Sequence, residues 1–336
     1  MKTNRYFSIV FFALFLLAAP VSAQWLKLGG QGRFTKKKRY WSVGMSANSM
    51  HYFGDIVPKS NLGSMDIKYT RPNIGVFAQK RFLPRFTGRM AFAWGQLAGS
   101  DHTSADPTDK DTGGFYRYKR NLHFRNNLYE LSTTVLFDFI ENQGLAQRRP
   151  DVPIPYLMAG IAAYYHNPQA IRPEADVHTG TPYSGSKWVD LRPLKTENQD
   201  KPYAAVGISI PVGVGVRYRI STSMDIGFEV GYRFTFSDYL DDVGGSYVDL
   251  GEFEDPLARS LHDRSAEPTD RYSGEARSPE TETFVSTVDG RTYTSVRGYG
   301  QGGVGELRGG SDKDAYFVMG FHVAYIFSFI KTPKYR

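Results

Sequence analysis

The sequence VGISIPVGVGVRYRISTSMDIGFEVGYRFTFS (residues 206–237) alternates apolar side chains with small or charged ones. A period of two places successive side chains on opposite faces of a β-strand. Only residues 221–223 separate the two alternating halves, so we expect a β-hairpin. Pro211 lacks the backbone N–H that a ladder hydrogen bond needs, and we expect a β-bulge at this position.

The same period recurs in six segments outside this hairpin. They are residues 41–48, 73–79, 86–95, 129–139, 157–163 and 317–329. Across all eight segments, one face carries aromatic and aliphatic side chains almost without charge. The other carries glycine, serine and charged residues such as Arg89, Glu130, Arg217, Glu229 and Arg233. An even number of strands is typical of outer-membrane barrels.

A soluble β-sandwich also alternates, and three features favour a membrane barrel instead. The charges share their faces with many glycines, which fits a narrow polar lumen better than a solvated sheet. Long connections alternate with short ones, as when long loops face the exterior and tight turns face the periplasm. The chain also ends near an aromatic alternating strand, as a closed sheet without lipid-exposed edges requires. We predict an all-β fold, an eight-stranded antiparallel transmembrane β-barrel with long extracellular loops.

The composition excludes several kinds of site. The chain has 336 residues, with 41 Lys and Arg against 34 Asp and Glu, and no cysteine. Without cysteine there are no disulfides, thiolate zinc sites, cysteine nucleophiles or iron–sulfur clusters. The seven histidines show no metal-ligand spacing. We therefore expect neither a metal nor a cofactor.

The first 23 residues have the features of a secretory signal peptide. Lys2 and Arg5 precede an apolar run at residues 9–19, and Val21-Ser22-Ala23 fits a cleavage site. An uncleaved anchor is the alternative, but the run is shorter than the roughly 20 residues that span a bilayer. No later stretch reads as a transmembrane helix. From the signal peptide together with the predicted barrel, we expect an integral protein of the Gram-negative outer membrane. Its predicted segments are the periplasmic residues 24–39, the barrel at 40–330, the longest extracellular loop at 238–313 and a periplasmic tail at 331–336.

Few residues suggest catalysis. His51 with Asp55, and His166, could meet at the barrel rim as a general base and the group that orients it. The alternative is that these are isolated rim histidines, which we favour because barrel rims are rich in aromatic residues. The glycine-rich residues 298–305 resemble a phosphate loop but lack the Lys-Ser/Thr that would follow, so we interpret them as a flexible loop. We predict no catalytic residues.

Three aspartates follow the 224–237 strand directly. Asp238, Asp241 and Asp242 could supply oxygen ligands to Ca²⁺, but they lack the spacing of an EF-hand loop. We therefore predict that they order the start of the 238–313 loop through hydrogen bonds. We expect this loop to cover the mouth of the barrel.

A basic cluster, Lys36 to Arg39, precedes the first strand. An exported protein rarely meets nucleic acid, so we exclude that partner. Anionic lipid head groups, an acidic periplasmic partner, or plain solvent remain as the alternatives.

Several stretches, in order, resemble the PorG family of outer-membrane barrels associated with the type IX secretion system. They are residues 51–55 (HYFGD), 71–75 (RPNIG), 167–170 (NPQA), 191–199 (LRPLKTENQ), 210–215 (IPVGVG), 236–243 (FSDYLDDV) and 247–249 (YVD). The resemblance runs from about residue 41 to residue 329. Asn198 departs from it, because glycine is expected there, and this departure concerns only a loop.

The resemblance implies a non-catalytic barrel that anchors or contacts the periplasmic PorK/PorN ring of that machine. Eight strands make a barrel that side chains fill, which also disfavours a wide pore. At the periplasmic end we expect Arg39, Arg85, Arg148 and Arg149 to bind an acidic partner, while outer-membrane lipid and lipopolysaccharide surround the barrel. The alternatives are a surface enzyme (a hydrolase or an acyltransferase) and a small-solute channel.

Overall fold

The computed structural model describes residues 34–57, 66–301, 307–310 and 312–327. The predicted signal peptide, the tail at 331–336, most of segment 24–39 and residues 302–305 of the glycine-rich stretch lie outside the described residues.

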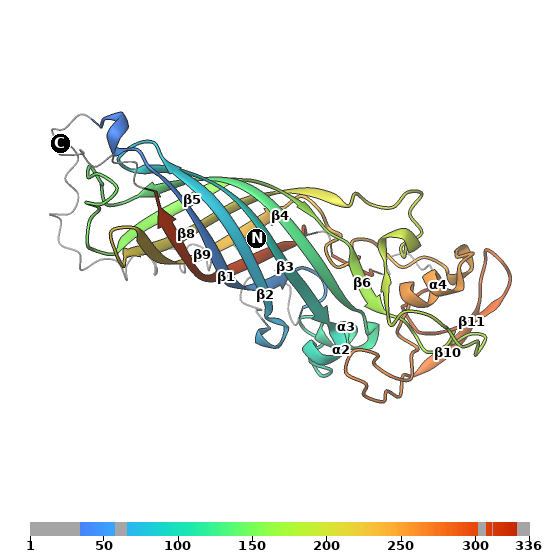
Figure 1. Ribbon diagram of the computed structural model, residues 1–336. Coiled ribbons are helices and arrows are strands. Elements are labelled where there is room, and N and C mark those ends of the chain that lie inside the picture. Colours follow the sequence, from blue (N-terminus) through green and yellow to red (C-terminus); the bar gives the residue numbers. More distant parts are fainter. Residues whose placement is uncertain (1–33, 58–65, 302–306, 311, 328–336) are drawn as a thin grey trace, which may run out of the picture.

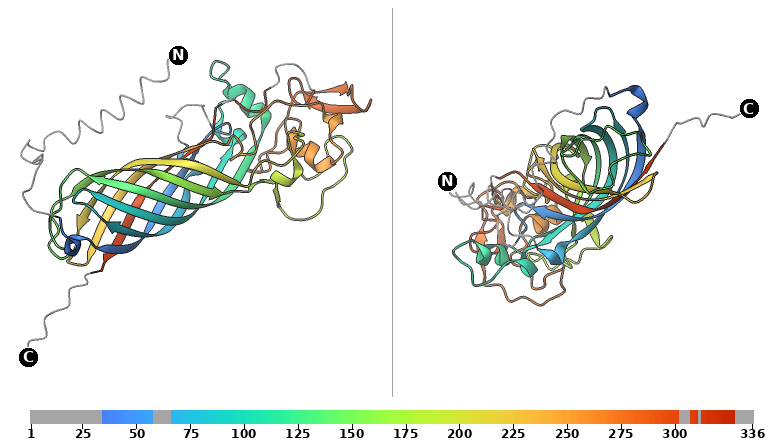
Figure 2. Two further views of the ribbon diagram at one scale, coloured as in Figure 1. Left: turned by 90° about the horizontal axis from the view of Figure 1, so that it is seen from above. Right: turned by 90° about the vertical axis from the view of Figure 1, so that its left-hand side faces the viewer.

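Eight antiparallel strands close into a barrel, which confirms the predicted fold (Figures 1 and 2). Within the described chain, a ten-stranded sheet runs β3-β2-β1-β12-β9-β8-β5-β4-β6-β7, and an additional β3–β4 pairing closes the ring. Strands β6 and β7 lie outside the ring: β6 pairs with the start of β4, and β7 pairs with β6. The barrel strands are β1 (Trp41–Phe53), β2 (Arg71–Arg81), β3 (Phe86–Ser100), β4 (His123–Asp138), β5 (Ile154–Tyr165), β8 (Val206–Arg219), β9 (Met224–Thr235) and β12 (Ala315–Ile326).

The alternation along each strand separates a lipid-facing side from a lumen side. In β8, Ile208 is 51% exposed whereas the next residue, Ser209, is fully buried. Glycines let large lumen side chains fit: a Cβ on Gly215 would lie 2.4 Å from the Tyr156 ring. An apolar outside and a crowded polar inside are what a small membrane barrel requires.

The expected β-bulge at Pro211 is wrong. On one side, β8 pairs with β9 in one register that includes Pro211 opposite Arg233. On the other side, pairing with β5 stops at Val212 and resumes at Ser209 in the same register. The missing N–H therefore interrupts one ladder locally without adding a residue to the strand, and Pro211 packs into the lumen.

The long connections gather at one end of the barrel, which we call the loop end (Figure 1). Their elements are η3 (Ile67–Tyr69), α2 (Asp101–Ser104), α3 (Gly114–Arg120), β6 (Pro168–Ile171), β7 (Trp188–Asp190), η4 (Arg192–Leu194), η5 (Leu250–Glu252), α4 (Pro256–His262), β10 (Thr281–Val285) and β11 (Thr292–Val296). Residues 101–122, 166–205 and 236–301 together form what we call the loop lobe. The short connections 82–85, 139–153 and 220–223, with η2 (Lys36–Lys38), lie at the opposite end, the turn end. Among the described helices, none is long and apolar enough to cross a membrane.

Strands β3 and β4 extend past the apolar band into the loop lobe. Their outward side chains change from Trp94 and Tyr129 to Gln96 and Asn127, which face each other across the ladder and share a 3.1 Å hydrogen bond. Arg125 follows, stacked 3.9 Å from the centre of the Trp188 ring. The outer face becomes polar there, so the apolar alternation that predicts the strands disappears although the ladder continues to Ser100.

One hydrophobic cluster joins the lobe to the barrel. Its members come from strand ends and loops: Met50, Tyr52, Ile56, Val57, Leu97, Leu122, Phe124, Leu128, Tyr164, Leu240, Val243, Tyr316 and Val318. Leu240 and Val243 belong to the 238–313 loop and are fully buried against strand residues. The loop therefore packs onto the end of the barrel.

Candidate functional site

The middle of the lumen is crossed by a salt bridge between opposite walls. The Arg89 guanidinium on β3 lies 2.5 Å from the Glu229 carboxylate on β9, and four steps around the ring separate these strands in either direction. Tyr156 on β5 donates a second hydrogen bond to Glu229.

Two further carboxylates tie the walls together. Towards the loop end, Glu130 accepts a 2.6 Å hydrogen bond from Tyr316 and lies 3.5 Å from Arg233. Towards the turn end, Asp138 pairs with Arg217 and, at 3.5 Å, with Arg81. All three carboxylates are buried or nearly so, and buried charges persist only when they are paired in this way.

Little free space remains in the lumen. Among the described residues, a cavity between these walls has a volume of about 60 Å³ and is lined by side chains such as Asn48, Asn73, Arg89 and Glu130. A water molecule takes about 30 Å³ of liquid, so the space suits a few waters and no larger solute.

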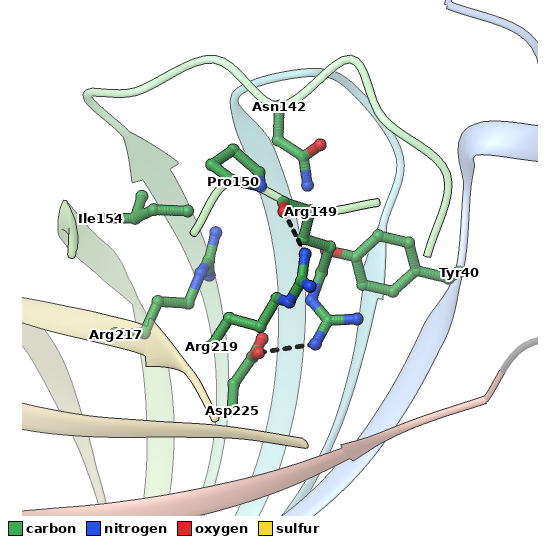
Figure 3. A pocket seen from close by; sticks show the side chains of 8 residues that line it. All are labelled: Tyr40, Asn142, Arg149, Pro150, Ile154, Arg217, Arg219 and Asp225. Atoms are coloured by element: carbon green, nitrogen blue, oxygen red, sulfur yellow. Dashed lines mark hydrogen bonds and ion pairs between the residues drawn. The ribbon is translucent and has the colours of Figure 1, made fainter. Parts of the chain in front are cut away.

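A second, smaller cavity lies at the turn end (Figure 3). It has a volume of about 10 Å³, and we call it the turn-end cavity. Its lining residues come from the N-terminal segment, the 139–153 connection, the start of β5 and the β8–β9 hairpin: Tyr40, Asn142, Arg149, Pro150, Ile154, Arg217, Arg219 and Asp225.

Arg149 holds this end of the barrel together from inside. It is only 4% exposed. Its guanidinium lies 2.8 Å from Asp225 and donates to the carbonyls of Ser221 at 3.0 Å and Thr222 at 2.8 Å. The side chain predicted to meet a partner is therefore buried, bonds to groups of the protein itself and does not form part of its surface.

The other predicted partner-binding arginines differ in exposure. Arg39 and Arg148 are exposed. Arg85 is half-buried, and its guanidinium donates a 2.6 Å hydrogen bond to the Phe139 carbonyl, which joins two turns. Tyr40 and Ala146 pack in one cluster with Ile326, which brings the segments of Arg39 and Arg148 together at the turn end.

Sequence reasoning missed Asn142, Arg219 and Asp225 as members of this site. Arg217, Arg219 and Asp225 all lie on the polar face of the β8–β9 alternation, and the two-residue period already places them in the lumen beside the hairpin turn. Nothing in the sequence indicates that the 139–153 connection folds inward to meet them.

At the loop end, Asp242 is the centre of a buried hydrogen-bond network. It accepts hydrogen bonds from Tyr203 at 2.8 Å and from Thr196, and it lies 3.7 Å from Arg308. Arg308 also pairs with Glu197 at 2.9 Å. Burial raises the pKa of Asp242 to about 6, while the Arg308 charge acts in the opposite direction. Asp242 thus connects loops from different parts of the sequence.

Asp241 lies in a separate group of carboxyls at the barrel mouth. Asp314 accepts hydrogen bonds from the Tyr52 hydroxyl and the Leu240 N–H, both at 2.7 Å. Burial raises the pKa of Asp241 and of Asp314 well above the ordinary range, and the neighbouring carboxylates raise it further. A raised pKa favours the protonated form, which can donate a hydrogen bond to a neighbouring carboxylate.

Asp238, the third predicted member, lies 3.5 Å from Lys313. In the described part of the chain, no group of three or more His, Asp or Glu side chains has the arrangement of a metal site.

The residues considered for catalysis lie in different surroundings. His51 contacts Ser49 at 3.3 Å and Thr70 at 3.5 Å. His166 donates to the Ala204 carbonyl at 3.0 Å, and Asp55 accepts from the Gly310 N–H at 2.8 Å. Among the described residues, no hydrogen bond or ion pair joins these three side chains.

Asn198 adopts the left-handed conformation, with φ of 53°. Glycine takes this conformation without strain, and asparagine is among the few other residues that tolerate it. The position where the resemblance expects glycine therefore has a backbone conformation that glycine also adopts without strain.

Solved structures of small barrels match most of the chain at low identity. Ail of Yersinia pestis is 7% identical and covers 86% of this chain and 99% of its own, with a TM-score of 0.35. The Neisserial surface protein A is 10% identical, covers 85% and 97%, and has a TM-score of 0.34. OprG of Pseudomonas aeruginosa is 7% identical, covers 86% and 96%, and has a TM-score of 0.35. No curated protein matches the chain.

One family model spans most of the barrel. It matches residues 33–184 and 181–254, a region that holds β1 to β9. The chain therefore belongs to the family described as Domain of unknown function (DUF6089).

Proposed function

We propose that this protein is a non-catalytic outer-membrane component of the type IX secretion system, which anchors or contacts the periplasmic PorK/PorN ring. The observation that carries the proposal is the closed lumen. The Arg89–Glu229 bridge crosses it, and the lumen cavity of about 60 Å³ holds a few waters only. A barrel without a solute path acts through its surfaces.

The turn end supplies a surface for a periplasmic partner. Short turns face the periplasm in barrels of this type. Arg39 and Arg148 are exposed there, and Lys36 and Lys37 add two more exposed charges. A group of like charges favours an acidic partner and speeds its approach. Because the sequence resembles the PorG family, the ring proteins are the partner that we propose for this surface.

The outer face of the barrel and the loop lobe suit other roles than partner binding. The apolar outer face meets lipid, and the loop lobe faces the exterior beside lipopolysaccharide. The lobe keeps its polar residues buried and paired, as Arg308 with Glu197 and Asp242 shows, which is the arrangement of a rigid cap.

The test is co-purification of the ring proteins with the tagged protein from outer membranes. Arg39→Glu together with Arg148→Glu reverses two exposed charges, and neither arginine takes part in an ion pair among the described residues. We expect the ring proteins to fall to background, as measured by mass spectrometry and immunoblot. Arg85 and Arg149 are left intact because both bind carbonyls of the turns.

The matched control reverses two exposed charges of the loop lobe, Lys201→Glu with Arg297→Glu. It should retain the ring proteins. Both double variants must show the heat-modifiable band of a folded barrel. Undiminished co-purification by the Arg39/Arg148 variant would contradict this surface, and absence of ring proteins from the wild-type sample would contradict the proposed function.

A further inference from the structure

The turn-end cavity contains buried hydrogen-bond donors without partners. Asn142 is 1% exposed, and its amide oxygen accepts the Gly144 N–H at 2.9 Å, which fixes the orientation of the amide. The amide nitrogen, Nδ2, has no partner, and neither does Nε of Arg149. Figure 3 shows the Asn142 nitrogen pointing towards the guanidinium groups. A buried donor without an acceptor is costly, so a guest that accepts hydrogen bonds is favoured here.

Positive charge exceeds negative charge around the same space. Arg149, Arg217 and Arg219 line the cavity, together with one carboxylate, Asp225. Asp225 pairs with Arg149. Arg217 pairs with Asp138, which Arg81 also contacts.

Arg219 has no carboxylate among the described ion pairs and donates a 2.6 Å hydrogen bond to the Arg149 carbonyl. Four guanidiniums therefore share two carboxylates. The charge without a carboxylate is that of Arg219, which is half-buried. Charge that is removed from water without a counter-charge is costly.

We propose that the turn-end cavity binds a monatomic anion, and that this anion is chloride. The ion accepts hydrogen bonds from Asn142 Nδ2 and Arg149 Nε, and it balances the charge of Arg219. A neutral water could satisfy the donors but would leave the excess positive charge in place.

The size of the cavity limits the guest. A volume of about 10 Å³ is close to the smallest space that admits one water. Carboxylate, phosphate and sulfate groups are too large. Chloride is larger than water, so its entry requires the half-buried Arg219 side chain to move.

The site connects three separate parts of the chain. Tyr40 precedes β1, Asn142 and Arg149 belong to the 139–153 connection, and Arg219 and Asp225 flank the β8–β9 turn. A bound anion holds these segments together at the periplasmic mouth. This inference does not depend on the secretion role.

The experiment uses the mature protein refolded in detergent. Its thermal unfolding is followed in sodium chloride and in sodium gluconate at equal sodium concentration, because gluconate is too large to enter. We expect a higher unfolding temperature in chloride, by about 3 °C for each tenfold rise in concentration above Kd. Chloride-35 NMR should show saturable line broadening that bromide competes away.

Asn142→Asp is the decisive variant. It keeps the acceptor for the Gly144 N–H, removes the amide donors and places a fixed negative charge beside the arginines. The variant should lose both the chloride-dependent stabilisation and the NMR broadening while still giving the heat-modifiable band of a folded barrel. Asn127→Asp is the matched control, because its oxygen accepts from Gln96 on the outer face, and it should respond to chloride as the wild type does.

Two results would overturn the proposal. One is equal stability of the wild type in chloride and gluconate without NMR broadening, which would mean that water alone fills the cavity. The other is an unchanged chloride response in folded Asn142→Asp, which would place any bound chloride elsewhere.

Discussion

Arg89 on β3 and Glu229 on β9 meet across the full width of the barrel, with 2.5 Å between guanidinium and carboxylate. Their strands lie on opposite sides of the ring and are distant in sequence. The pair fixes the distance between two walls and occupies the middle of the lumen. Its removal should affect both stability and permeability.

Glu229→Ala should destabilise the barrel strongly. The substitution leaves the buried Arg89 guanidinium without its counter-charge and removes the acceptor of Tyr156. Breaking a buried pair on one side costs about 3–5 kcal/mol. The measurement is the temperature at which the folded band disappears in heat-modifiability gels. Glu280→Ala is the control, because its pair with Lys119 is 3.9 Å long and 93% exposed at the glutamate, and it should cost less than about 1 kcal/mol.

The wild-type barrel should not conduct ions steadily in planar bilayers. The lumen is bridged at three levels, by Glu229, Glu130 and Asp138 with their arginines. A general porin reconstituted in the same way serves as the positive control. Stable unitary current steps from the wild-type protein would show that the bridges open and would support a channel.

Asp241→Asn should stabilise the loop lobe increasingly as the pH rises. Burial holds the pKa of Asp241 well above that of the unfolded chain. The folded form therefore keeps a proton that the unfolded form releases above about pH 4, and this contribution to stability is lost as the pH rises. An asparagine does not titrate. The measurement is the rate of limited proteolysis within residues 236–301. The variant should be cleaved more slowly than the wild type, by a factor that grows from pH 4 to pH 7. Asp312→Asn, at an exposed position, should show no such trend.

His262 should limit the stability of the lobe in acid. Its Nδ1–H donates to the Thr196 carbonyl at 2.5 Å, and its Nε2 accepts from the Val248 N–H at 3.1 Å. Burial lowers its pKa to about 3. The folded-state pKa lies below the unfolded value, so the stability is present above about pH 6.5 and is lost as the pH falls.

The loss should reach about 2 kcal/mol at pH 5. His262→Gln should remove this acid dependence, as followed by hydrogen exchange of α4. An equal decline of variant and wild type between pH 6.5 and pH 5 would assign the effect to other groups.

The sequence determined the barrel because lipid-facing positions are apolar, whereas many lumen positions hold glycine, small polar residues or paired charges. This contrast between the two faces produces a period of two residues in the membrane part of each strand, as in residues 206–237. The period disappears where the outward side chains become polar, at Gln96 and Asn127, so it does not predict the parts of β3 and β4 nearest the loop end. The period also placed Arg217, Arg219 and Asp225 inside.

Only the tertiary structure decided which charges meet. Arg149 lies in a connection without a hydrophobic period. Its side chain points inward because Asp225 and the carbonyls of the β8–β9 turn bind its guanidinium there. Asp241 and Asp242 are neighbours in sequence, yet Asp241 lies among the carboxyl side chains near Asp314, whereas Asp242 pairs with Arg308. Such pairings depend on distances between strands and loops that are far apart along the chain, and no local pattern encodes those distances.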